Sequence, residues 1–274
     1  MIAMKARRIV GGCFVLFATI ICLLGYVVAD SALCPVDYYS GWSLLAIILV
    51  LALLNARKKL LAVPLGSAVM WLGVHVYLGV VSVVVFLFHV KWSAPDGPLE
   101  ATLAVIFLLV AGTGFAGLLL SRVLAVRLSR RGDEVIFERI PGFTNGLRRR
   151  AQRLVFESVK TGVSVTIADF YQLRLARYFS RPRYVVGYLF GLTSASHALL
   201  SELGSLNRYL SESERPIRQE LERVIQQKDE LDFQYTLQAT LKYWLFVHIP
   251  LTYSLLLFVP LHVLVVYAFS GELP

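Results

Sequence analysis

Four of the five histidines in this 274-residue chain lie inside two long apolar segments, and they share one spacing. His75 and His89 form the first pair, and His248 and His262 form the second, so that each pair has the pattern H-x13-H. An ionisable side chain inside lipid is costly and is usually functional. Imidazole is also the commonest metal ligand among side chains. Two pairs with identical spacing therefore favour one shared function, in which the four imidazoles bind metal.

Helix geometry makes such sites possible. Fourteen residues of helix place the two imidazoles of a pair roughly 21 Å apart along the axis, and a rotation of about 1400° returns them to nearly the same face. Two such helices side by side could hold two metal centres stacked across a bilayer. Iron porphyrin suits this arrangement because it takes two axial nitrogen ligands, and helix bundles build cofactor sites from facing side chains. We therefore expect two haem b groups.

The composition predicts an integral membrane protein in which these helices are embedded. The chain is 57% hydrophobic, its mean hydropathy is +0.66, and a membrane span needs about 20 apolar residues. The expected fold is an all-α haem-binding bundle of five transmembrane helices with a mainly helical cytoplasmic insert between helices 4 and 5. The spans are predicted at 9–29, 41–61, 66–90, 100–121 and 243–268. The domains are then 1–127 (helices 1–4), 128–242 (the insert) and 243–274 (helix 5 and the C-terminus).

The net charge of +9 is explained by membrane topology, and we expect no nucleic-acid partner. Basic residues flank alternate ends of the predicted spans, and such ends face the cytoplasm. They are Lys5, Arg7, Arg8, Arg57, Lys58, Lys59, Arg122, Arg127, Arg130 and Arg131. The N-terminus and the insert are therefore expected inside and the C-terminus outside, in a bacterial inner membrane. The first apolar run also resembles a signal peptide, but it lacks a clear small-x-small site and is expected to be an anchor.

This topology predicts how the histidines pair. The third and fifth spans both run from inside to outside, so that His75 and His248 fall at one depth and His89 and His262 at another. We therefore assign the first two to an inner haem and the last two to an outer haem. Lys242, Arg57 and Lys58 near the inner haem, and Lys91 with Trp92 near the outer one, could contact haem propionates or act as ordinary interfacial anchors.

Small residues on the third span fit a bound cofactor. Gly79 and Ser82 follow His75 by four and seven residues, which places them on the histidine face. A bulky side chain there would collide with a flat ring that approaches the backbone. We predict that both residues border haem, although small residues also serve ordinary helix packing in membranes.

Other motifs exclude competing chemistry. Gly112, Gly114 and Gly117 spell G-x-G-x-x-G, but they lie in an apolar helix with no preceding strand, so close helix approach or room for a porphyrin edge is favoured over nucleotide binding. The three cysteines form neither C-x-x-C nor C-x-x-C-H, which excludes covalent c-type haem attachment and a cysteine-ligated iron–sulfur cluster. No hydrolase motif is present.

The insert carries weaker signals. Residues 133–140 alternate like a short strand, and Pro141-Gly142 and Asn145-Gly146 are typical of turns. A charged helix is expected from Ser211 to about Glu230, continuing toward the last span. The apolar stretch 184–200 should lie on the membrane surface or in a small core.

Two polar features of the insert are predicted to be less specific. Arg148 to Arg150 and Arg153 form a basic cluster that could bind anionic lipid or a partner, although solvated charge is the commoner reading. His197 has no nearby second ligand in the sequence and is expected to be structural.

The duplicated H-x13-H helices resemble the di-haem cytochrome b superfamily. Their position on the third and fifth spans is similar to the transmembrane domain of ferric reductases and NADPH oxidases. The resemblance covers only the membrane helices, and it implies axial ligation of haem iron by His75, His89, His248 and His262. No flavin or nicotinamide domain follows the last helix, which argues against a self-contained NADPH-driven reductase.

The function expected from these features is transmembrane electron transfer. The chain would be a di-haem b-type subunit of a membrane oxidoreductase complex, exchanging electrons between quinone or quinol and a partner redox protein, either a soluble or a multihaem electron carrier. One alternative is a stand-alone transmembrane reductase fed by a flavoprotein. Another is a transporter or assembly protein without haem, whose histidines handle protons or a metal ion.

Overall fold

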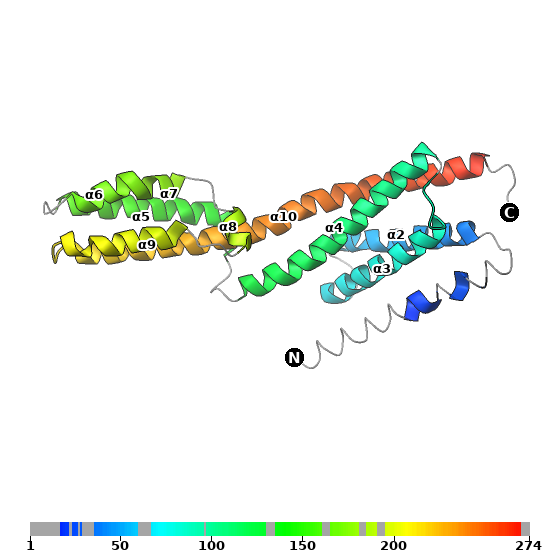
Figure 1. Ribbon diagram of the computed structural model, residues 1–274, viewed down its shortest axis with the longest axis horizontal. Coiled ribbons are helices and arrows are strands. Elements are labelled where there is room, and N and C mark those ends of the chain that lie inside the picture. The colour runs from blue at the N-terminus through cyan, green and yellow to red at the C-terminus, as the bar shows by residue number, and fades with distance from the viewer. Residues whose placement is uncertain are drawn as a thin grey trace. The chain divides into compact units, whose positions relative to one another are not determined.

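The computed structural model describes residues 17–21, 24–26, 28, 36–59, 67–95, 97–129, 135–160, 165–180, 185–190 and 195–269. Every regular element in these residues is helical, which confirms the all-α class (Figure 1). The chain divides into two compact units. Unit 1 comprises Met1–Leu119 with Trp244–Pro274, and unit 2 comprises Leu120–Tyr243. Unit 2 thus largely coincides with the predicted insert.

Four helices among the described residues are long and apolar enough to cross a membrane, and the chain therefore has the character of an integral membrane protein. They are α2 (Val36–Lys59), α3 (Ala68–His89), α4 (Pro98–Leu128) and α10 (Arg215–Phe269). These helices correspond to the second through fifth predicted spans. Most of the first predicted span, 9–29, lies outside the described residues, and the described parts 17–21, 24–26 and 28 are helical. The total of five spans therefore stays a prediction.

Unit 1 has a small core, to which α2, α3, α4 and α10 all contribute. Its buried members are Leu44, Ile48, Val81, Val85, Phe86, Phe107, Leu255 and Val259. Phe86 of α3 stacks on Phe107 of α4, with ring centroids 4.3 Å apart. Many other large apolar side chains on these helices are exposed, among them Leu119 and Leu257. Apolar residues on both the core and the outer face are typical of helices that lie in lipid.

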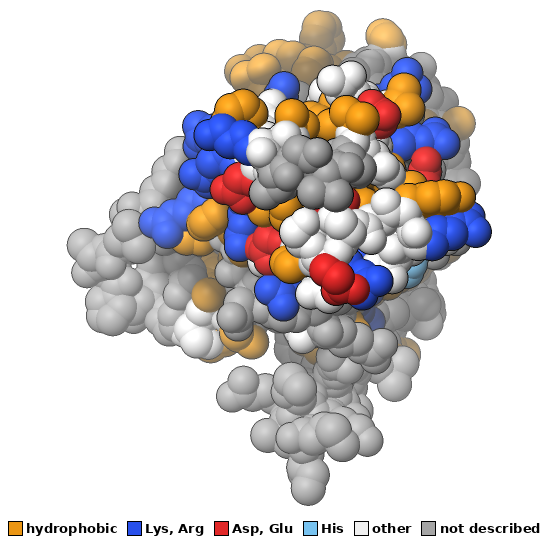
Figure 2. Space-filling view, turned by 90° about the vertical axis from the view of Figure 1, so that its left-hand side faces the viewer, with side chains coloured by type: hydrophobic (Ala, Val, Ile, Leu, Met, Phe, Trp, Pro, Cys, Tyr) orange, Lys and Arg blue, Asp and Glu red, His pale blue; other side chains and the backbone are white. Residues whose placement is uncertain are grey.

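Unit 2 is built on a conventional buried core. Unit 2 contains the end of α4 from Leu120 and the first part of α10. Between them lie α5 (Ile140–Lys160), α6 (Thr166–Phe170), α7 (Ala176–Ser180), α8 (Val185–Phe190) and α9 (Ala195–Ser205), with the short elements η1 (Phe137–Arg139), η2 (Tyr171–Leu175, a π-helix) and η3 (Leu206–Tyr209). Leu203, Leu221, Val224 and Ile225 are completely buried in it. The surface is mixed: Figure 2 shows Lys and Arg side chains on both flanks of one end, with carboxylates and apolar side chains between them.

The predicted strand and turns at the start of the insert are wrong. Residues 130–134 lie outside the described residues, and Phe137–Arg139 form a single turn of 3-10 helix. The dipeptides Pro141-Gly142 and Asn145-Gly146 lie within α5. Proline is tolerated in the first turn of a helix because its missing N–H would have no partner there. The completely buried Ile140, Ala151 and Ser158 recur at helical spacing, so tertiary packing overrides the weak helix propensity of Gly and Asn.

The expected charged helix begins at Arg215, four residues after the predicted start at Ser211, and continues without a break as α10, which has 55 residues. Glu214 accepts hydrogen bonds at 3.0 Å from both the backbone N–H and the hydroxyl of Ser211. These two hydrogen bonds, both accepted by the Glu214 carboxylate, hold the turn that precedes α10. A helix of this length extends about 80 Å, whereas the hydrocarbon core is about 30 Å thick. The same helix therefore contributes its first part to unit 2 and its last part, from Trp244, to unit 1.

The remaining predictions for the insert concern its apolar stretch and its lone histidine. Within 184–200, Tyr188 packs in a small cluster with Leu124, Phe233 and Leu237, and Leu199 joins the main core. The described part of the stretch therefore contributes to the core of unit 2. His197 is exposed on α9.

Candidate functional site

The two predicted histidine pairs come together in unit 1, between α3 and α10. The ring centroids of His89 and His262 are 6.3 Å apart, and the ring planes are nearly perpendicular, at 86°. His75 and His248 lie close enough for their charges to interact. The lower-numbered histidine of each helix thus faces the lower-numbered one of the other, so α3 and α10 run parallel here, as the predicted topology requires.

The distance between His89 and His262 matches that of two ligands on one metal. A metal–imidazole bond is about 2.0 Å long, so two imidazoles on opposite sides of a metal have ring centres roughly 6 Å apart. The observed 6.3 Å agrees with this value. The described residues contain no group of three or more His, Cys, Asp or Glu side chains that could hold a metal ion. Within the described residues, the site therefore offers two imidazoles.

His89 and His262 both line a cavity of about 540 Å³. This volume is typical of sites for cofactors and small molecules. Side chains of the unit 1 core form its apolar wall, including Leu44, Phe86 and Phe107. Its polar lining residues come from the ends of the four helices: Asp37, Tyr38, Lys91, Glu100 and Tyr267. A flat apolar group with charged edges would match such a lining.

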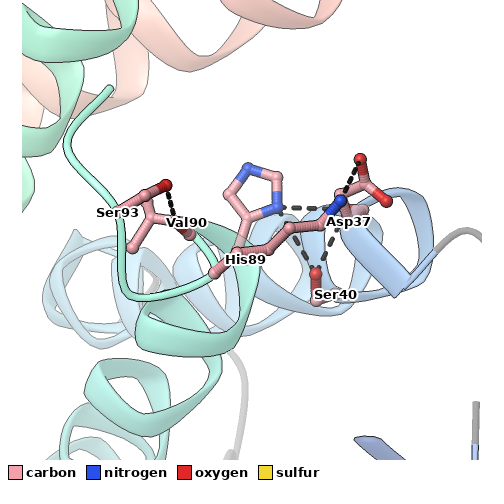
Figure 3. Close-up of polar contacts among 6 residues, drawn as sticks. Asp37, Ser40, His89, Val90 and Ser93 are labelled. Atoms are coloured by element: carbon pink, nitrogen blue, oxygen red, sulfur yellow. Dashed lines mark hydrogen bonds and ion pairs between the residues drawn. The ribbon is translucent and has the colours of Figure 1, made fainter. Parts of the chain in front are cut away.

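A backbone carbonyl orients the His89 ring, as Figure 3 shows. The ring Nδ1 lies 3.0 Å from the carbonyl oxygen of Asp37. Since a carbonyl can only accept, Nδ1 carries the proton and Nε2 keeps the lone pair that a metal needs. Ser40 Oγ donates to the same carbonyl at 3.1 Å. Histidines that bind metals commonly donate their second ring N–H in this way, which fixes the tautomer.

The turn after His89 is strained. Lys91 and Trp92 have φ angles of 50° and 57°, which non-glycine residues rarely adopt and which cost about 1–2 kcal/mol each. The turn is closed by hydrogen bonds from Trp92 N–H to Leu87 O at 3.2 Å and from Ser93 N–H to Val90 O at 3.0 Å. It brings Lys91 Nζ to 3.3 Å from the carboxylate of Asp37. The end of α3 is thereby tied to α2 beside the cavity.

The His75 ring is oriented by a backbone carbonyl, as the His89 ring is. Its Nδ1 lies 3.2 Å from the carbonyl oxygen of Leu51 on α2. The carbonyl again requires a proton on Nδ1 and leaves the Nε2 lone pair for a ligand. Both histidines of α3 are therefore oriented by the backbone of α2.

His248 is oriented by side chains instead. Its Nδ1 is 2.9 Å from Thr113 Oγ1 on α4. The indole of Trp244, one turn earlier on α10, stacks on the imidazole with centroids 5.4 Å apart, and its Nε1 donates to the Thr113 carbonyl at 2.7 Å. A Cβ on Gly117 would overlap this indole, and one on Gly114 would lie 3.6 Å from the imidazole. Gly117 of the G-x-G-x-x-G pattern thus allows this close approach of α4 and α10, whereas a Cβ at position 114 would make only an ordinary contact.

The two small residues predicted to border haem differ in the structure. A Cβ on Gly79 would meet no described atom within 4 Å, so there is open space beside it. Ser82 is buried, and its hydroxyl donates to the Gly79 carbonyl of its own helix at 2.8 Å. An added methyl group at Gly79 would therefore meet no described neighbour, whereas the hydroxyl of Ser82 is satisfied within α3. Contact of either residue with haem stays a prediction.

Among the residues expected to contact propionates, Lys91 lines the outer cavity. Lys242 lies in unit 2 and donates to Glu138 at 3.0 Å, which holds the pKa of that carboxyl below its usual range. The side chains of Arg57 and Lys58 lie outside the described residues. Of the residues in this set whose side chains the structure describes, Lys91 lines the cavity.

The residues that orient the histidines were not predicted. Asp37 and Leu51 act through backbone carbonyls, which carry no side-chain signal. Thr113 lies 135 residues from His248 in the sequence. Only Trp244 had a visible signal, because a position four residues before a histidine lies on the same helix face.

Comparisons with protein-family models, with curated proteins and with solved structures return no match to this chain. Function is therefore inferred from the geometry of the two histidine pairs.

Proposed function

We propose that the chain is a di-haem b-type cytochrome subunit that carries electrons across a membrane. His89 and His262 would ligate the outer haem, and His75 and His248 the inner haem. The observation that carries the proposal is the 6.3 Å separation of the His89 and His262 rings at the edge of a cavity of about 540 Å³. Both the spacing and the volume suit a planar cofactor held between two imidazoles.

The hydrogen-bond partners of the histidines support this proposal over a proton relay. Three of the four rings have Nδ1 next to an acceptor provided by Asp37 O, Leu51 O or Thr113 Oγ1. A ring fixed in one tautomer is well suited to bind a metal through Nε2. A proton relay works by exchanging protons between both ring nitrogens, which these contacts oppose.

Haem, when bound, would supply one-electron redox chemistry. The chain's own contribution is to hold the ligands at two depths, roughly 21 Å apart along each helix, and to surround them with apolar side chains that exclude water. Burial and hydrogen bonds to the imidazoles are the means by which a protein sets haem potential. An electron that moves between the two depths crosses part of the membrane potential, which is worth about 2.3 kcal/mol per 100 mV for a full crossing.

The partners follow from this role. Quinone or quinol would exchange electrons within the lipid, and a soluble or multihaem carrier in another subunit would exchange them at the surface. The basic segments support an orientation with the N-terminus and unit 2 in the cytoplasm and the C-terminus outside, and the proposed membrane is a bacterial inner membrane. A flavoprotein donor in place of quinol is the alternative.

Reconstituted vesicles test this function. The purified chain is placed in lipid vesicles that contain trapped ferricyanide, and dithionite is added outside. We expect bleaching of ferricyanide at a rate far above that of protein-free vesicles and of vesicles with a His89→Ala, His75→Ala double variant. Equal rates in all three would contradict the proposal. Direct reduction of the chain by a short-chain quinol would favour the quinone role over the flavoprotein-fed one.

A further inference from the structure

We infer that Thr113 is a positioning residue, which fixes His248 in the tautomer that can bind a metal through Nε2. The part of this inference that concerns haem rests on the proposed function. The part that concerns the tautomer of His248 depends only on hydrogen bonds among residues of unit 1.

The single hydroxyl hydrogen of Thr113 decides which ring nitrogen of His248 carries its proton. A threonine hydroxyl has one hydrogen, and Thr113 Oγ1 lies 2.8 Å from Leu109 O and 3.0 Å from Val110 O, both on its own helix. Either carbonyl can only accept, so the hydroxyl hydrogen is committed to the backbone. The contact of 2.9 Å with His248 then requires Nδ1–H as the donor. Thr113 therefore fixes the proton on Nδ1 and leaves the lone pair on Nε2.

Trp244 holds the same assembly from a second direction. Its indole stacks on the His248 imidazole at an interplanar angle of 21°, and its N–H donates to the backbone carbonyl of Thr113. The imidazole is thus held at its edge by the Thr113 hydroxyl and on its face by the Trp244 ring. Gly117 provides the space that the indole occupies. Two contacts of different kinds leave the ring little freedom to rotate.

Loss of the acceptor has a definite consequence for a bound haem. An acceptor on Nδ1–H makes the imidazole a stronger electron donor to its metal, which favours the oxidised iron. Removal of the Thr113 hydroxyl should therefore raise the midpoint potential of the inner haem. Thr113 acts only through His248, and no effect on the outer haem is expected.

The first experiment needs no haem. The full-length chain is labelled with ¹⁵N-histidine, prepared without haem in lipid nanodiscs, and studied by NMR, with the His248 signals assigned by their loss in His248→Gln. We expect the Nδ1–H tautomer in the wild type and in Thr113→Ser, and a mixture with the Nε2–H tautomer in both Thr113→Val and Thr113→Ala. Thr113→Val keeps the volume of the threonine side chain. Thr113→Ala provides the same test if the valine variant does not fold.

Thr102 offers a matched control on the same helix. Its hydroxyl donates to Pro98 O at 2.7 Å, and the residue is exposed. Thr102→Val should leave the His248 signals unchanged. Wild-type signals in both Thr113→Val and Thr113→Ala would overturn the inference.

The second experiment uses the haem-loaded chain and redox titration of its visible spectrum. Thr113→Val should raise the potential of one haem and leave the other unchanged, and Thr113→Ser should restore the wild-type value. Equal shifts in Val and Ser would show a packing effect and would also overturn the inference. If the wild-type chain binds no haem, the proposed function fails, and the NMR result alone then decides whether Thr113 fixes the tautomer.

Discussion

The outer pair (His89 and His262) and the inner pair (His75 and His248) each take one histidine from α3 and one from α10, but they differ in how their rings are held. In the outer pair, His89 donates to the backbone carbonyl of Asp37, and the pair lines a cavity of about 540 Å³. In the inner pair, His75 also donates to a backbone carbonyl, but His248 contacts the Thr113 hydroxyl and stacks on Trp244.

This difference indicates which of the contacts that orient the histidines a substitution can remove. A backbone carbonyl stays in place when its own side chain is changed, so the orientation of His89 should tolerate changes at Asp37. The Thr113 hydroxyl and the Trp244 ring are side-chain features, so a single substitution can remove them. We therefore expect the inner site to be the more sensitive of the two to substitutions around its ligands.

The largest expected effect is loss of haem when a ligand is removed. His89→Ala or His262→Ala should reduce the haem content from two to one per chain with the inner haem retained, and His75→Ala or His248→Ala should do the reverse. The pyridine haemochrome assay measures the content, and low-temperature spectra show which haem remains. His197→Ala is the control, because this exposed residue lies in unit 2. Retention of both haems in all four ligand variants would refute the assignment of these histidines as haem ligands.

The next largest effect is expected at Gly117. A Cβ there would overlap the Trp244 indole, so Gly117→Ala must displace the ring that stacks on His248. Overpacking of this kind costs about 1–3 kcal/mol. Denaturant unfolding of the chain in detergent should show this loss, and only the inner haem spectrum should change. Gly112→Ala is the matched control on the same helix, since its Cβ would meet nothing within 4 Å.

A smaller effect is expected at Gly41, which faces the outer ligand. Its Cβ would lie 3.0 Å from His89 Cε1, so Gly41→Ala should shift the imidazole by a few tenths of an ångström. We expect altered electron paramagnetic resonance g-values for the outer haem without loss of haem. Gly114→Ala makes an ordinary contact of 3.6 Å with His248 and should leave the inner signal unchanged. Altered g-values of the inner haem, with unchanged g-values of the outer haem, would contradict this prediction.

The smallest effect is expected for the ion pair between Lys91 and Asp37. Both side chains are more than half exposed, at 58% and 53%, and exposed pairs contribute about 1 kcal/mol or less. Asp37→Asn should therefore keep the outer haem, because the carbonyl that accepts from His89 is retained. Haem content and denaturant midpoint measure the outcome. Complete loss of the outer haem would show that the carboxylate, rather than the backbone, holds the site.

The sequence predicted the membrane helices and the histidine pairing well because both depend on periodicity. Apolar length identified α2, α3, α4 and the end of α10, and the parallel course of the third and fifth spans predicted which histidines lie together. These properties are set by helix geometry and topology rather than by individual contacts. Whether the histidines bind haem is not decided by the same reasoning and stays a prediction.

The errors and omissions have physical causes. Gly142 and Asn145 favour turns locally, but burial of Ile140 and Ala151 in unit 2 keeps the segment helical. Thr113 was missed because its role depends on the approach of α4 to α10, and the sequence carries no direct record of that approach. The Lys91 turn was missed because its positive φ angles are not those that its residue types favour.

The haem content of the purified wild-type chain tests the central claim most directly. A dithionite-reduced minus oxidised spectrum, combined with the pyridine haemochrome assay and protein quantification, should show b-type absorption bands and two haems per chain. A colourless chain that takes up no haem when expressed with excess haem supply would contradict the account.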